Sequence, residues 1–290
     1  MKVVGFSFIR NAGLYDYPIV EAITSVLPLC DEFIISVGKS DDNTLELIKA
    51  IPSGKIRIVH SVWDDSLREG GRVLAAETDK AYAAVPDDAD WVFYIQGDEV
   101  LHEKYLTVIR SAMEEHLGDS SVEGLLLHYL HFYGSYDYVG DSRKWYRREI
   151  RIIRKSDQIV SYRDAQGFRT RDNRKLRVKP VEAWMYHYGW VKTLEKQKAK
   201  IRHFSSFWHG EEQMSEVDRH VEAFDYSQID SLAAFEGTHP AVMHPRIDRM
   251  AEKRRFNTTV KKYSVRVRAL TLIEKWSGWR IGEYKNYRIQ

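Results

Sequence analysis

The chain of 290 residues is 43% hydrophobic and 30% charged, which excludes a disordered chain, and its longest apolar runs are too short to span a bilayer. Its single cysteine, Cys30, excludes an intrachain disulfide and a cysteine zinc cluster, and its first residues lack the zones of a secretory signal, so we expect a cytoplasmic protein. Residues 1–119 contain 11 Lys and Arg and 21 Asp and Glu, so this part is acidic, whereas residues 120–290 contain 33 Lys and Arg and 21 Asp and Glu. The basic second part either binds an anionic partner or is ordinary solvated surface.

The first hundred residues alternate between apolar runs and helical patterns. The runs that predict strands are Val3 to Ile9, Phe33 to Val37, Ile56 to Val62 and Trp91 to Ile95. Helical patterns begin near Pro18, at Asp42 or Thr44, and at the capping-box spacing Ser66-Leu67-Arg68-Glu69. Strands that alternate with helices predict βαβ units and a mainly parallel sheet.

The pattern changes after about residue 118. Strand-like runs joined by short polar turns predict an antiparallel or mixed extension of the sheet: Gly124 to Tyr133, Ile150 to Arg154, Ile159 to Tyr162 and Leu176 to Tyr188. From about Lys192 the pattern is mostly helical. We therefore expect a Rossmann-type α/β domain over residues 1–190, followed by a helical extension over residues 191–290.

An acidic turn, Gln96-Gly97-Asp98-Glu99, directly follows the apolar run that ends at Ile95. In open α/β sheets ligands bind beyond the carboxyl ends of the strands. Two adjacent carboxylates there supply the hard oxygen ligands that Mg²⁺ or Mn²⁺ prefers, and such a cation can bridge two phosphates. The alternative is an ordinary solvated turn. His187, in an aromatic segment, is either a third ligand or a core histidine.

Together these motifs resemble a bacterial family-2-type glycosyltransferase of the GT-A fold. Besides the acidic turn, the resemblance rests on Arg10-Asn11 after the first strand, the loop Lys39-Ser40-Asp41-Asp42-Asn43-Thr44 after the second, and Tyr186-His187-Tyr188-Gly189-Trp190. It implies an inverting, hexosyltransferase-type enzyme with a nucleotide-sugar donor and a divalent cation, Mn²⁺ or Mg²⁺. Asp98, Glu99 and His187 are the expected metal ligands.

The donor is expected to lie along the ends of the first strands. The candidate donor-binding residues are Phe8, Arg10, Asn11, Ser40, Asp42, Arg72 and Gln96. For Arg72, near a helix start, a solvated helix face is the alternative. Two positions depart from the family pattern and leave the donor's base open: Gln96 replaces the first aspartate of the metal motif, and Gly38 replaces an aspartate that often binds uracil.

The catalytic base is expected in the second half of the chain. An inverting enzyme needs a carboxylate that accepts the proton of the acceptor hydroxyl. Asp164, in a glycine-containing loop after a strand, is the first candidate and Glu182 the second; a surface ion pair with Arg163 is the alternative for Asp164.

The same residues leave two further functions open. One is a sugar-nucleotide nucleotidyltransferase, although the loop after the first strand has only one glycine, Gly13. The other is a non-catalytic nucleotide-binding protein on the same fold, which the departures at Gln96 and Gly38 suggest.

Basic and aromatic segments bear on the partners. The stretch Arg143 to Arg151 suits the donor diphosphate or an anionic acceptor, and no nucleic acid is expected because its alternation indicates a half-buried strand. Val265 to Trp279 is amphipathic, which indicates either packing against the main domain or peripheral contact with the inner membrane face. The acceptor is unidentified, with a polysaccharide and a lipid-linked glycan both open.

Overall fold

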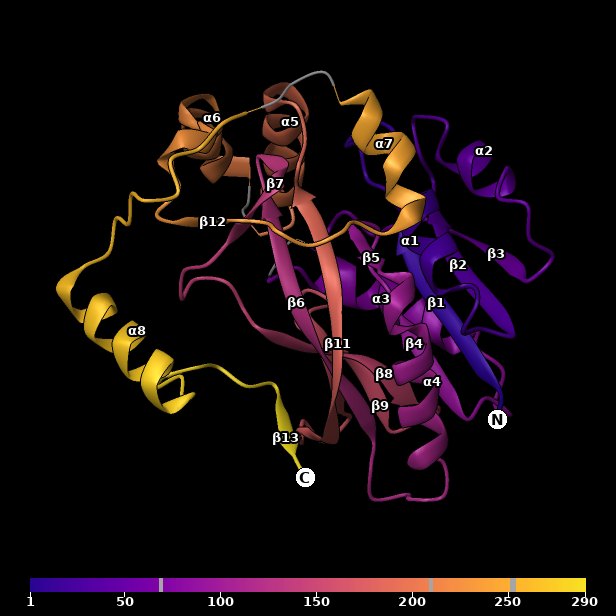
Figure 1. Cartoon of the computed structure of the whole chain (residues 1–290). Coiled ribbons are helices and arrows are strands. Elements are labelled where there is room, and N and C mark those ends of the chain that lie inside the picture. Colours follow the sequence, from indigo (N-terminus) through magenta and orange to yellow (C-terminus); the bar gives the residue numbers. More distant parts are fainter. Residues whose placement is uncertain (68–69, 209–210, 251–253) are drawn as a thin grey trace.

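The computed structural model of the chain describes residues 1–67, 70–208, 211–250 and 254–290. A mixed sheet forms its centre, in the order β12-β7-β6-β8-β4-β1-β2-β3, with β11 added beside β6 (Figure 1). The strands are β1 (Val3–Ile9), β2 (Glu32–Gly38), β3 (Ile56–Ser61), β4 (Trp91–Tyr94), β5 (Glu99–Leu101), β6 (Gly124–Tyr133), β7 (Ser135–Gly140), β8 (Arg148–Arg154), β9 (Ile159–Tyr162), β10 (Gly167–Thr170), β11 (Leu176–Trp190), β12 (Leu232–Ala234) and β13 (Tyr287–Ile289). The helices are α1 (Ile19–Val26), α2 (Thr44–Lys49), α3 (Arg72–Ala83), α4 (Leu106–Glu115), α5 (Leu194–Ser205), α6 (Met214–Ala223), α7 (His244–Arg249) and α8 (Val265–Ser277).

The N-terminal half is the predicted parallel α/β layer. β1 pairs in parallel with β2 and β4, and β2 pairs in parallel with β3. Apolar residues of α1, α2 and α4 pack on one face of these strands and those of α3 on the other. Since helices cover both faces, every residue of β4 is buried, which explains its continuous apolar sequence. Cys30 is buried in this layer, and burial raises the pKa of its thiol to about 12.

The second half extends the sheet in mixed orientation, as predicted. β8 runs antiparallel to both β4 and β6, and the long strand β11 runs parallel to β6. The short strand β5, which follows the acidic turn, pairs antiparallel with β11 and sets His187 opposite Glu99. This pairing brings β11 to the carboxyl end of β4.

The region after residue 190 contains helices α5 to α8, as expected, but it also completes the sheet. β12 pairs with β7, and β13 pairs with β11. The capping box expected at Ser66 to Glu69 includes Arg68 and Glu69, which lie outside the described residues; α3 begins at Arg72.

Glu149, on β8, gives a prediction for stability. It is buried, one carboxylate oxygen accepts a hydrogen bond from Gln166, and its Oε2 has no hydrogen-bond partner in the described part of the chain. Burial raises its pKa to about 7. A carboxyl whose pKa is higher in the folded state stabilises the fold at low pH and loses that contribution as pH rises through the folded pKa. Glu149→Gln should therefore raise the free energy of unfolding at about pH 8 by about 1–3 kcal/mol.

At about pH 5, where most of Glu149 is protonated in the folded state, the same variant should differ little from the wild-type protein. Urea unfolding at the two pH values measures both differences. An equal change in stability at both would contradict the prediction, because it would show that the charge of Glu149 is not the cause.

Candidate functional site

A cavity of about 590 Å³ lies at the carboxyl ends of β1 and β4. Residues that follow β1 and β4 line it on one side, and β11 and α5 line it on the other. The lining includes Phe8, Arg10, Trp63, Gln96, Asp98, Tyr146, Arg151, Asp164, Gln166, His187, Lys200 and Phe207. A cavity at this edge of a parallel sheet is the expected position of a ligand site in an α/β fold.

Three ionisable side chains meet in this cavity. The Lys200 ammonium donates to Asp98 Oδ2 at 2.9 Å, and His187 Nε2 lies 3.6 Å from the same oxygen. Burial by itself would raise the pKa of Asp98, but Lys200 and His187 outweigh that effect and hold the pKa well below its ordinary value. Gly189 permits this approach, because a Cβ there would lie 2.6 Å from Asp98 Oδ2 and 2.7 Å from the His187 ring. Asp98 is therefore an ionised carboxylate inside the cavity.

Glu99, the second predicted carboxylate ligand, has a different role. It is fully buried, and Arg151 binds its two oxygens at 2.7 and 2.9 Å. The Tyr129 hydroxyl donates to Glu99 Oε1 at 2.6 Å, and the backbone N–H of Gln96 donates to Glu99 Oε2 at 3.0 Å. Both oxygens of Glu99 already have partners here, so Glu99 could bind a metal only if its contacts with the buried Arg151 opened.

A second histidine, His131, orients His187. Its Nε2 lies 2.9 Å from the Tyr146 carbonyl, which can only accept, so Nε2 donates. Burial and the nearby His187 lower the pKa of His131 to about 3, so the ring is neutral and its Nδ1 must accept. The partner of that Nδ1 is His187 Nδ1 at 3.2 Å, which therefore donates. With its Nδ1 bound to His131, His187 turns its Nε2 toward Asp98 Oδ2.

These contacts decide whether a divalent cation fits. In the described ranges of the chain, no group of three or more His, Cys, Asp and Glu side chains is placed to hold a metal. Asp98 and His187 nevertheless direct a carboxylate oxygen and a ring nitrogen at one point, and the other nitrogen of His187 is fixed by a hydrogen bond, as in most histidine ligands of metals. Mg²⁺ commonly binds through one or two protein ligands and substrate phosphates. The pair thus fits a cation that arrives with a diphosphate, once Lys200 gives up its bond to Asp98.

Gln96 ties the acidic turn to the opposite wall. Its Nε2 donates to the Ala165 carbonyl at 3.1 Å, and Arg151 donates to the neighbouring Gln166 carbonyl at 3.0 Å. An aspartate at position 96 could not make the first of these bonds, because an ionised carboxylate has no proton to donate. Glutamine at position 96 therefore makes a structural contact that an aspartate could not make.

Asp164, the first candidate for the base, lies in the loop that these bonds hold. Its side chain lines the cavity, and burial raises its pKa. Arg163 and Ala165 on either side have φ values of 56° and 63°, in the left-handed region that non-glycine residues rarely adopt. Glu182, the second candidate, is exposed, faces His128 at 3.5 Å and lies outside the described cavity lining. The structure therefore brings only Asp164 to the site.

An aromatic wall lies on the side of β1. The Arg10 guanidinium stacks over Trp63 at 4.6 Å, and Phe8 and Phe207 pack against the same indole. Gly38 is needed here, because a Cβ at that position would lie 2.4 Å from Trp63 Nε1. Trp63 thus fills the space that a side chain at position 38 would need.

Three predicted donor residues serve the loops instead of the cavity lining. The side-chain oxygen of Asn11 accepts a hydrogen bond from the backbone N–H of Asp41, and the backbone N–H of Asn11 donates to the Ser40 hydroxyl at 3.1 Å. Asp42 accepts from the Leu14 amide at 2.7 Å. These bonds join the loop after β1 to the loop after β2 and so position Arg10. Arg72 opens α3 as an exposed residue outside the described lining.

No protein-family model and no curated protein sequence matches the chain significantly. Similar solved structures include S. aureus TarS 1–349 in complex with UDP, at 13% identity over 77% of this chain and 71% of that one, with a TM-score of 0.41. 4-Diphosphocytidyl-2C-methyl-D-erythritol synthase from Anaerococcus prevotii is 15% identical over 76% of this chain and 96% of that one, with a TM-score of 0.38. Glucosyl-3-phosphoglycerate synthase from Mycobacterium tuberculosis, in complex with Mn²⁺, UDP and phosphoglyceric acid, is 18% identical over 45% of this chain and 43% of that one, with a TM-score of 0.31. At these identities and TM-scores, an activity has to be argued from the site itself.

Proposed function

We propose that the chain is a glycosyltransferase that moves a sugar from a nucleotide-sugar donor to an acceptor hydroxyl with inversion, assisted by a divalent cation. The observation that carries the proposal is the meeting of Asp98, His187 and Lys200 in a cavity at the carboxyl ends of β1 and β4. An ionised carboxylate, an oriented imidazole and an ammonium suit a diphosphate and its counter-ion. A cation held by Asp98 and His187 would offset the negative charge on the departing nucleoside diphosphate.

The chain's own residues would bind and position the donor. Lys200 can release Asp98 and pair with a phosphate oxygen, since its ammonium lies in the same cavity. Arg10 adds a second positive charge from the aromatic wall, and Phe8 and Trp63 offer ring surfaces to the base or the sugar. Both cations would then face the donor's phosphates.

Asp164 is the proposed general base. The acceptor oxygen would attack the anomeric carbon, the bond from that carbon to the diphosphate oxygen would break, and Asp164 would take the hydroxyl proton. A raised pKa favours this role, because a more basic carboxylate accepts a proton more readily. The wall opposite the acidic turn is a suitable position for it.

A thermal-shift screen of nucleoside diphosphates, with Mn²⁺ and with EDTA, tests the donor site. One nucleoside diphosphate should raise the melting temperature in the presence of Mn²⁺, because a ligand that binds only the folded state stabilises it. Asp164→Asn should keep that shift and lose sugar transfer. Release of pyrophosphate from a nucleoside triphosphate would instead favour a nucleotidyltransferase, and binding without sugar release would favour a binding protein.

A further inference from the structure

Helix α8 stands at the edge of the molecule, away from the central sheet (Figure 1). It is defined at both ends, because the Ser264 hydroxyl accepts from the Val267 amide and Gly278 adopts a left-handed φ of 69°. It has no fully buried residue. Its orientation therefore depends on the few contacts that it makes with the rest of the chain.

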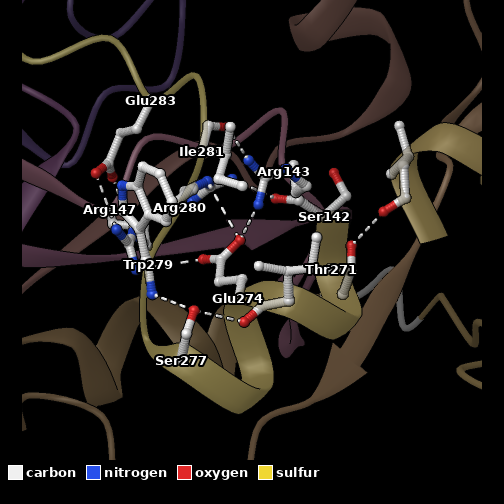
Figure 2. Close-up of polar contacts among 12 residues, drawn as sticks. Ser142, Arg143, Arg147, Thr271, Glu274, Ser277, Trp279, Arg280, Ile281 and Glu283 are labelled. Atoms are coloured by element: carbon white, nitrogen blue, oxygen red, sulfur yellow. Dashed lines mark hydrogen bonds and ion pairs between the residues drawn. The ribbon is translucent and has the colours of Figure 1, made fainter. Parts of the chain in front are cut away.

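One face of α8 is held by ion pairs. The carboxylate of Glu274 binds Arg143, and it also lies 3.2 Å from Arg147 and 3.7 Å from Arg280 (Figure 2). Arg147 is fixed in turn by Glu283, with contacts at 2.8 and 2.9 Å. Glu274 is the only acidic residue in α8, and this network turns it toward the protein. Half-buried Val267, Leu270 and Thr271 lie on the same side.

The opposite face is apolar and exposed. Val265, Ala269, Leu272 and Trp276 recur at spacings of four, three and four, which places them on one side of the helix. The exposed fractions are 85% for Val265, 68% for Leu272 and 91% for Trp276. Ile273 lies beside this stripe, and Trp279, just after the helix, is 63% exposed. Such a stripe is costly in water and indicates a surface that is covered in use.

Cations border the stripe. Arg266 lies on one side of it and Arg268 and Lys275 on the other, all three exposed. An apolar stripe with tryptophan, between rows of cations and without an acid on the outer side, has the chemistry of a helix that lies in the plane of an anionic bilayer. A second copy of the chain would be a poor partner, because apposed stripes would bring these like charges together.

We propose that the outward face of α8, formed by Val265, Ala269, Leu272, Ile273 and Trp276 and continued by Trp279, binds the surface of an anionic lipid bilayer. Apolar side chains would enter the boundary between headgroups and acyl chains, and Arg266, Arg268 and Lys275 would meet lipid phosphates. In the part of the chain that the structure describes, no helix has the length and apolarity to cross a membrane. A helix that lies in the plane of the bilayer surface binds peripherally, and this binding does not depend on the function proposed above.

The loop that holds α8 also reaches the cavity. Arg143 and Arg147, which grip Glu274, flank Tyr146, whose side chain lines the cavity and whose carbonyl accepts from His131. Membrane binding and the candidate site thus share one loop.

Vesicle co-sedimentation of the full chain tests the proposal. Vesicles of phosphatidylcholine alone are compared with vesicles of equal parts phosphatidylcholine and phosphatidylglycerol. We expect the wild-type protein to bind the anionic vesicles, more weakly at high salt. Leu272→Ser with Trp276→Ser should weaken that binding about tenfold or more, and so should joint replacement of Arg266, Arg268 and Lys275 by glutamine.

Val62→Ser is the matched control, because Val62 is an apolar residue of the N-terminal half with an exposed fraction of 73%. This variant should bind vesicles as the wild-type protein does. All variants alter exposed side chains, and melting curves check that they fold. A wild-type protein that binds neither vesicle, or serine variants that bind as it does, would overturn the proposal. Sedimentation velocity tests whether a second copy of the chain covers this face instead. A dimer that the serine variants abolish would assign the face to a second copy and refute the lipid assignment.

Discussion

Replacing Asp98 with asparagine is expected to lower the rate of sugar transfer on the order of a thousandfold. The carboxylate is the one acid in the cavity whose pKa is held well below its ordinary value, so it carries a full negative charge at neutral pH. Asparagine keeps the shape of the side chain and its contact with Lys200 but removes that charge. Nucleoside diphosphate binding, measured by calorimetry with Mn²⁺ and with EDTA, should lose its dependence on the metal.

The control for Asp98→Asn is Asp88→Asn. Asp88 is an exposed acid that pairs with Lys2 at 2.5 Å, before the amino ends of β1 and β4 and so opposite to the cavity, and its replacement should change neither rate nor metal dependence. Unaltered turnover in Asp98→Asn would reject the proposed site. Loss of turnover with metal-dependent binding intact would instead assign Asp98 to the chemistry alone.

The central features of the site could be predicted because they follow from local rules. A buried strand ending at Ile95 places the acidic turn at the ligand-binding edge of the sheet. The placement of His187 near Asp98 required a family resemblance, because it results from the antiparallel pairing of β5 with β11. The short strand β5 itself carries too few residues to give a pattern of its own.

The remaining residues of the site could not be predicted from spacing. Lys200 lies in a helix of several lysines, and only the position of α5 over the cavity distinguishes it from its neighbours. His131 lies between Tyr129 and Tyr133 at alternate positions of β6 and has the pattern of a core residue. Trp63 follows β3 and gains its role from Gly38, which lies close in space. These contacts are tertiary, so one-dimensional patterns do not contain them.

The different surroundings of Glu99 and Asp98 show the same limit. Both acids follow the same strand, and sequence alone treats them as equivalent ligands. In the structure the backbone turn directs Asp98 into the cavity and Glu99 to Arg151, which comes from β8. Arg151 in turn holds the Gln166 carbonyl, in the loop that carries Asp164. Glu99 therefore acts on the site through the loop that it helps to position.

A stability measurement separates this role from metal binding. Glu99 and Arg151 are 0% and 1% exposed, so removing one partner leaves the other charge buried without compensation. Glu99→Gln or Arg151→Met should each lower the free energy of unfolding by about 3–5 kcal/mol. The double variant should lose less than the sum of the two, because it removes both charges together. Urea unfolding of the three variants and the wild-type protein gives the coupling free energy between Glu99 and Arg151.

The Mn²⁺ affinity of Glu99→Gln shows whether Glu99 also binds the metal. If Glu99 only anchors Arg151, the Mn²⁺ concentration that half-saturates nucleoside diphosphate binding should be the same in folded Glu99→Gln as in the wild-type protein. A Glu99→Gln variant of full stability that needs far more Mn²⁺ would return Glu99 to the metal site, and it would require the bidentate contact with Arg151 to open when the donor binds.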